Sequence, residues 1–111
     1  MKAKLLIRKN NEKFSNFKFN KYAVDLLGLE NRLTNLYFAN HNNLVYVSNS
    51  NIPWGRCVQV LGKKKLHHFS DKDLFSEILT PLFNNYHGES VLKFELNHIS
   101  NTYYYLTRIN D

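Results

Sequence analysis

The side chains that most often carry out acid–base, nucleophilic or metal chemistry are spread thinly through this sequence. The five histidines are His41, His67, His68, His87 and His98. None of the spacings typical of metal sites, such as H-x-H, H-E-x-x-H or C-x-x-C, occurs in the chain. His67 and His68 are adjacent, but on a strand they would point to opposite faces of the sheet. We therefore expect surface or turn histidines and no metal site.

A catalytic role for the one cysteine, Cys57, would require a histidine as base and an Asn or Asp to orient it. The sequence singles out no such triad, and a small, buried or half-buried hydrophobe on a strand is the simpler interpretation. Asp71 and Asp73 suit the positive first turn of a helix better than a metal site. The four glycines, at 28, 55, 62 and 88, are too far apart for a phosphate-binding loop. The sequence thus predicts a protein that is not an enzyme, with no catalytic residue and no cofactor.

Positive charge is concentrated at the start of the chain. The formal net charge is +6, and residues 1–22 account for all of it, because seven basic side chains there are opposed only by Glu12. Such a segment attracts nucleic acid or an acidic protein surface, although lysines also protect strand edges. A second basic run follows Gly62. The expected basic contact residues are Lys2, Lys4, Arg8, Lys9, Lys13, Lys18, Lys63, Lys64 and Lys65.

Aromatic residues form a second group of candidate contacts. Trp54 lies in an expected loop close to Arg56, and three consecutive tyrosines begin at Tyr103. On a strand, Tyr103 and Tyr105 share one face while Tyr104 takes the other, so one face presents tyrosine to solvent or a partner. We add Trp54, Arg56 and Tyr104 to the candidate contacts. Aromatic and arginine side chains suit base stacking or a protein interface, while packing in the core is the alternative.

The clearest local pattern covers residues 17–29. Phe17 and Phe19 alternate with a lysine, as in a half-buried strand. Asn20 can then cap a helix with its side-chain oxygen, and Gly28 can end that helix in the left-handed conformation. A second helix is expected to end or kink at Pro81.

The whole chain predicts an α+β fold: mostly antiparallel β-sheet built from hairpins, with two short helices at about residues 20–28 and 70–83. The strands are expected at residues 2–8, 14–19, 33–39, 44–47, 56–61, 66–69, 91–99 and 102–109. They are expected to form four hairpins, the first strand pairing with the second, the third with the fourth, the fifth with the sixth and the seventh with the eighth. Residues 1–111 form a single domain. The start of the chain does not read as a signal peptide, and no apolar run approaches about 18 residues. We therefore expect a soluble cytoplasmic protein.

Two resemblances bear on function. Residues 19–33, F-N-K-Y-A-V-D-L-L-G-L-E-N-R-L, are similar to the strand, helix, turn and strand of AbrB-type transition-state regulators. That resemblance implies a swapped-hairpin dimer that binds DNA through basic residues, although Glu30-Asn31-Arg32 stands where the family has a Gly-Asp turn. In overall character the chain also resembles the small, basic α+β proteins of phages and mobile elements, among them anti-CRISPR proteins. This second resemblance implies binding to an RNA-guided nuclease or its guide RNA, and it carries over no particular residue.

The sequence therefore predicts a non-enzymatic, phage-type binding protein. Its expected partner is a nucleic acid, RNA or DNA, or a nucleic-acid-bound protein such as a CRISPR effector, which it would engage as an anti-CRISPR inhibitor. The alternative is an AbrB-like DNA-binding transcription regulator. Neither hypothesis requires a membrane.

Overall fold

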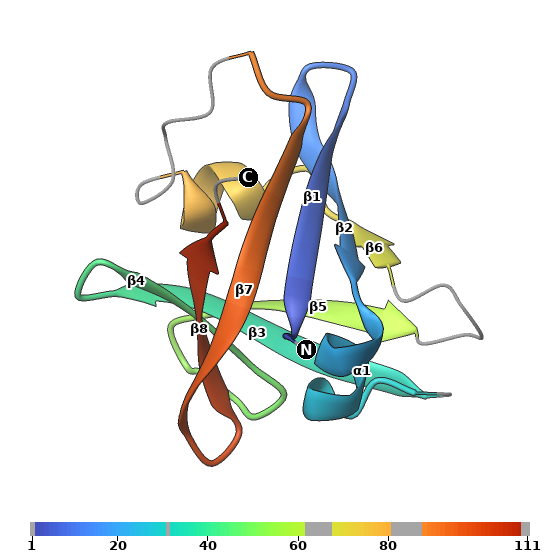
Figure 1. The fold of residues 1–111 in the computed structure, drawn as a ribbon. Coiled ribbons are helices and arrows are strands. Elements are labelled where there is room, and N and C mark those ends of the chain that lie inside the picture. Colours follow the sequence, from blue (N-terminus) through green and yellow to red (C-terminus); the bar gives the residue numbers. More distant parts are fainter. Residues whose placement is uncertain (1, 31, 62–67, 81–87, 110–111) are drawn as a thin grey trace.

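The described part of the chain forms eight strands and two short helices (Figure 1). The computed structural model describes residues 2–30, 32–61, 68–80 and 88–109. The strands are β1 (Lys4–Asn10), β2 (Lys13–Phe19), β3 (Leu33–His41), β4 (Leu44–Ser48), β5 (Arg56–Leu61), β6 (His68–Ser70), β7 (Val91–Ser100) and β8 (Tyr103–Arg108). The helices are α1 (Lys21–Leu27) and the π-helical turn η1 (Phe75–Leu79). The expected combination of antiparallel sheet with two short helices is confirmed, and the balance is mainly β.

The strands form one antiparallel sheet in the order β5-β3-β4-β8-β7-β1-β2-β6. Three of the neighbouring pairs, β1–β2, β3–β4 and β7–β8, are hairpins that the sequence predicts. In Figure 1, β1 and β7 cross steeply in front of β3 and β5. The edge strands β5 and β6 come into contact with each other. The sheet therefore curls into a nearly closed barrel.

Apolar residues at alternate strand positions fill the inside of this barrel. Phe17, Phe38 and Phe94 are fully buried there. The ring of Phe17 stacks on that of Phe69, with centroids 4.7 Å apart and ring planes 5° from parallel. The ring centroid of Phe69 also lies 6.1 Å from that of Phe38. One aromatic cluster thus joins β2, β3 and β6, and its rings adopt the offset and tilted arrangements that such pairs favour.

Helix α1 begins and ends as the sequence predicts. Asn20 Oδ1 accepts hydrogen bonds from the amide of Ala23 at 3.0 Å and from the amide of Lys4 at 2.9 Å, which ties the helix to β1. Gly28 follows with φ of 64°, where a side chain would be strained. The strands on either side of α1 are β2, which pairs with β1 and β6, and β3, which pairs with β4 and β5.

Two details of the expected fold are wrong. β6 pairs with β2, with Phe69 opposite Phe17, and does not form a ladder with β5. Within the expected helix at 70–83, the π-helical η1 spans five residues and follows a turn in which the Asp71 carboxylate accepts hydrogen bonds from the amides of Asp73 and Leu74. Residues 81–83 lie outside the described part of the chain. None of the described helices has the length and apolar character needed to span a membrane.

Candidate nucleic-acid interface

Strands β1, β2 and β6 contain no acidic residue, while β1 and β2 together carry five basic ones. Lys4, Arg8 and Lys18 alternate with buried core residues and therefore point away from the barrel interior. Strand pairing places Arg8 beside Asn16, and Lys18 beside His68. We call the outward residues of these three strands the basic face: Lys4, Leu6, Arg8, Asn16, Lys18, His68 and Ser70.

The basic face contains a shallow hollow of about 270 Å³. It is lined by Arg8, Asn16, Phe17, Lys18, His68 and Ser70. The Ser70 hydroxyl donates to Asn16 Oδ1 at 3.0 Å, so β2 and β6 are linked by side chains as well as by backbone here. Two cations and several uncharged hydrogen-bonding groups thus converge on one surface. These are the side-chain types that contact phosphate oxygens and sugars in nucleic-acid complexes.

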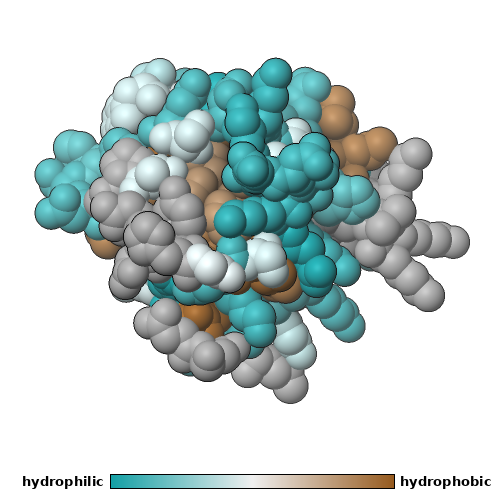
Figure 2. Space-filling view, turned by 90° about the horizontal axis from the view of Figure 1, so that it is seen from above, coloured by the Kyte–Doolittle hydropathy of each residue, from teal (hydrophilic) through white to brown (hydrophobic). Residues whose placement is uncertain are grey.

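Lys9 and Lys13 lie at the turn end of the β1–β2 hairpin and belong to a different surface. A bulge at Ser15 of β2 places Lys9 opposite Phe14, and the Lys9 Nζ lies 5.2 Å from the centre of that ring. Both lysines line a second hollow, of about 220 Å³, together with Lys72 of the turn before η1. Figure 2 views the molecule from this end and shows hydrophilic residues over most of the described surface, with hydrophobic ones in small groups between them. Five of the seven early cations therefore fall into two groups, three on the basic face and two at this turn.

The remaining predicted basic contacts lie elsewhere. Lys2 forms an ion pair with Glu95 of β7, with 3.3 Å between Nζ and Oε1. Because Glu95 is also the partner of Lys4 in the β1–β7 register, this carboxylate marks one border of the basic face. Lys63, Lys64 and Lys65 lie outside the described residues, so their position relative to the basic face stays a prediction.

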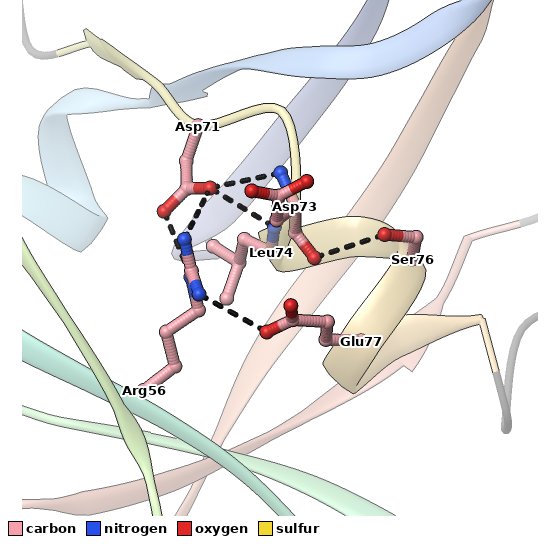
Figure 3. A network of polar contacts seen from close by, with 6 residues as sticks. All are labelled: Arg56, Asp71, Asp73, Leu74, Ser76 and Glu77. Carbon is pink, nitrogen blue, oxygen red and sulfur yellow. Dashed lines mark hydrogen bonds and ion pairs between the residues drawn. The ribbon is translucent and has the colours of Figure 1, made fainter.

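Arg56 is occupied by contacts within the protein. From the start of β5, its Nε and Nη2 each donate to one carboxylate oxygen of Asp71 at 3.0 Å, and its Nη1 donates to Glu77 at 3.0 Å (Figure 3). The hydrogen bond with Asp71 raises the pKa of Arg56. Asp71 directly follows β6, so this forked pair joins the two edge strands of the sheet at a place where they share no backbone ladder. We call this junction the seam, and we assign Arg56 to it in place of partner binding.

The seam should weaken in acid. Burial would raise the pKa of Asp71, but hydrogen bonds from Arg56 and from the amides of Asp73 and Leu74 outweigh burial and hold that pKa below its ordinary value. A carboxyl whose folded pKa is lowered stabilises the fold above its unfolded pKa of about 4, and the contribution is lost as the pH falls through the folded pKa. Urea unfolding below about pH 5 should therefore show a steeper loss of stability in the native protein than in Asp71→Asn. Equal slopes would show that Asp71 is not held ionised.

The aromatic candidates are divided between surface and core. Trp54 is 64% exposed in the loop between β4 and β5, whereas Tyr104 is 7% exposed and packs inside the barrel. Its neighbours Tyr103 and Tyr105 are half-buried on the other face of β8, which confirms the predicted alternation. Tyr104 therefore belongs to the core, and the tyrosines available to a partner are Tyr103 and Tyr105.

Trp54 and Tyr103 help to line a pocket of about 320 Å³ on the outside of the barrel. We call it the ring pocket; its lining residues are His41, Tyr46, Asn51, Ile52, Pro53, Trp54, Ile99, Ser100 and Tyr103. It lies toward the opposite end of β7 from the basic face, because Arg8 pairs with Val91 at the start of that strand and Ile99 lies near its end. The basic and aromatic candidates thus form two separate surfaces.

Cys57 lies on β5 as expected, opposite Tyr37 of β3, but its predicted burial is wrong: its side chain is exposed, because the buried positions of this strand are Val58 and Val60. A hydrogen bond with Cys57 is the largest of the effects that raise the pKa of Tyr37. Among the described residues, no three His, Cys, Asp or Glu side chains lie close enough together to hold a metal ion. His67 and His87 are not among those residues.

Asn16, His68 and Tyr46 line the candidate surfaces, and the sequence reasoning missed all three. Asn16 and His68 reach the basic face through the register of β2 with β1 and β6, and Tyr46 reaches the ring pocket because β4 lies beside β8. The alternation of apolar and polar residues predicts which face of its own strand each residue occupies. It does not predict which other strand lies beside that strand in the sheet. The comparisons with known proteins add no further guide: no protein-family model, curated protein or solved structure matches this chain.

Proposed function

We propose that the protein is a non-enzymatic binding protein that holds the sugar-phosphate backbone of a nucleic acid, RNA or DNA, on its basic face. The observation that carries this proposal is the charge of three neighbouring strands. β1, β2 and β6 present Lys4, Arg8 and Lys18 on one surface and contain no acidic residue. The sheet therefore concentrates positive charge that the sequence spreads over two strands and a turn.

Recognition of a backbone requires little beyond such a surface. Arg and Lys neutralise phosphates, and Asn and Ser donate hydrogen bonds to their oxygens. Each neutralised phosphate releases condensed counterions, so binding weakens steeply as salt is added. No outward position of the basic face carries Phe, Tyr or Trp, so stacking on bases has no support there. Binding at this face should therefore be largely independent of sequence.

The wider proposal is that this binding inhibits a nucleoprotein machine, as an anti-CRISPR protein inhibits an RNA-guided nuclease. A small protein that occupies a guide RNA or the path of the target strand can block cleavage without any chemistry of its own. The chain's size, its charge and its resemblance in character to anti-CRISPR proteins support this form of the proposal. Cleavage of a target plasmid by purified RNA-guided nucleases should stop at equimolar inhibitor, and undiminished cleavage across all nuclease types would contradict it.

Removing the two cations of the hollow should weaken nucleic-acid binding and flatten its salt dependence. We expect the double variant Arg8→Gln/Lys18→Gln to lower the slope of log Kd against log salt by about 1.5, since two phosphate contacts are lost. Both side chains are exposed, so the fold should be retained. Fluorescence anisotropy with labelled single-stranded RNA and duplex DNA, at several salt concentrations, measures this slope.

A matched control separates the basic face from net charge. The double variant Arg32→Gln/Lys72→Gln removes the same charge from two exposed positions outside the face, and it should keep most of the slope. An equal loss in both variants would mean that overall charge drives binding, and no binding by the native protein would overturn the proposal. Binding of duplex DNA alone, by a dimer, would point to the AbrB-type regulator instead.

A further inference from the structure

The ring pocket gathers aromatic side chains from four separate parts of the chain. His41 comes from β3, Tyr46 from β4, Trp54 from the loop before β5 and Tyr103 from β8. The rings of His41 and Trp54 lie 6.0 Å apart at 53°, so the two are tilted rather than stacked. Trp54 nevertheless remains 64% exposed. The pocket thus presents ring surface to solvent, at the small end of the volumes typical of ligand sites.

The loop that carries Trp54 is held in place before any ligand arrives. Ile52 is 4% exposed and anchors the loop, and the amide of Gly55 donates to the Ile52 carbonyl at 2.8 Å, which closes a tight turn around the tryptophan. A Cβ on Gly55 would lie 3.1 Å from two backbone oxygens, those of Ile52 and Phe38, so the turn packs closely against β3.

Hydrogen bonds also tie this loop to the β7–β8 hairpin. The hydroxyls of Ser50 and Thr102 lie 2.7 Å apart, and Ser48 Oγ donates to Thr102 at 3.3 Å. The Tyr103 hydroxyl donates to the Asn51 carbonyl at 3.4 Å. The loop is already fixed on both sides. Binding of a ligand therefore does not require the loop to lose conformational entropy, which favours binding.

We propose that the ring pocket takes an unpaired nucleobase, so that the nucleic acid held by the basic face is single-stranded; this inference rests on the function proposed above. Aromatic side chains stack on any base, because every base has a π-face. Among the residues that the structure describes, no Asp, Glu, Lys or Arg lines the pocket, which suits the uncharged part of a nucleotide. The side chains of Asn51 and Ser100 supply hydrogen-bonding groups at its edge.

A protein side chain would fit the same rings, but the surface between the two sites favours a nucleic-acid strand. Both sites lie on the outer surface of the barrel, and β7 lies between their strands in the sheet order. Along β7, Ile99 of the ring pocket lies about 26 Å from Val91, opposite Arg8, and about 13 Å from Glu95, opposite Lys4. The outward residues of β7 along this path are Lys93, Glu95 and Asn97. The Glu95 carboxylate is ion-paired with Lys2, and Asn97 lies opposite Tyr105 of β8. A barrel-spanning site of this kind would hold a strand within the range of about 4–16 nucleotides seen for other single-strand-binding barrels.

The test compares two labelled RNAs of equal length and charge: a decamer of uridines and a decamer whose sugars carry no bases. Because Trp54 is the one tryptophan of the chain, its emission reports directly on the pocket. We expect the uridine decamer to quench Trp54 and to bind about tenfold more tightly than the abasic one. In Trp54→Ala, anisotropy should show that this tenfold difference has disappeared while the salt slope is unchanged. Tyr22→Ala, an exposed ring on α1, is the matched control and should keep the difference.

The outcomes separate this inference from the proposed function. Equal binding of both decamers, abolished by Arg8→Gln/Lys18→Gln, overturns the base site and leaves the backbone site standing. Binding of neither decamer overturns the proposed function and the base site with it. A Trp54 shift with N-acetyl-phenylalaninamide but not with uridine would assign the pocket to a protein partner and overturn the inference. Thermal unfolding of each variant confirms that it is folded.

Discussion

Replacing Asp71 with alanine is expected to lower the free energy of unfolding by about 3 kcal/mol. The Asp71 carboxylate is 13% exposed and accepts four hydrogen bonds, two from the Arg56 guanidinium and two from the amides of Asp73 and Leu74. Its removal leaves a partly buried cation without its main partner and frees two amides at the start of η1. It also opens the seam between β5 and β6. Urea unfolding followed by circular dichroism measures the change.

A neighbouring carboxylate provides the control for this prediction. Asp73→Asn alters a residue whose backbone, and not its carboxylate, makes the contacts drawn in Figure 3. We expect a change below about 0.5 kcal/mol there. Arg56→Met should destabilise less than Asp71→Ala, and the double variant should show coupling between the two residues. If Asp71→Ala behaved like Asp73→Asn, the forked ion pair would not hold the barrel closed.

Replacing Phe17 with alanine is expected to lower the free energy of unfolding by about 3–5 kcal/mol, the range for truncating a fully buried aromatic side chain. Phe17 has no exposed surface and stacks on Phe69, and its ring lies 6.5 Å from that of Phe38. The variant would leave a cavity among three strands that meet near the seam. A typical domain of this size is stable by about 5–15 kcal/mol, so the variant should unfold at a much lower urea concentration.

Leu6→Ala is the companion variant, since Leu6 lies on the adjacent strand but on the outer surface. Leu6→Ala should lower the free energy of unfolding by less than about 1 kcal/mol, because the Leu6 side chain remains partly in contact with water in the folded protein. A small effect of Phe17→Ala, comparable with that of Leu6→Ala, would mean that neighbouring side chains close around the vacated space.

Much of the fold could be predicted because its signals are local. Alternation along each strand assigns Phe17 and Phe19 to the interior and Lys18 to the surface, and the structure places all three so. The cap at Asn20 and the left-handed Gly28 likewise depend only on neighbours in the sequence. The partner of β6 could not be predicted in this way. Its pairing with β2 is decided by the stacking of Phe69 on Phe17, a contact between residues about fifty positions apart.

The candidate site shows the same division. Alternation predicts that Lys4, Arg8 and Lys18 share a surface, and they do. The sequence favours Arg56 as a contact residue, because an arginine near a tryptophan is typical of a binding loop. Whether its charge is free depends on Asp71, and nothing in the local sequence brings these two residues together. Tyr104 was chosen from among three tyrosines whose faces alternation separates without saying which face is inside.

The pairing of β1 with β7 has a consequence for how the chain acquires its shape. Leu5 lies opposite Phe94, although about 90 positions separate them. During synthesis, the β1–β2 hairpin leaves the ribosome well before the strand that covers its other edge, and it waits with an unsatisfied backbone. Contacts of such long range slow folding, so this protein should complete its barrel late, and the hairpin that bears the cations should be its most aggregation-prone part until then.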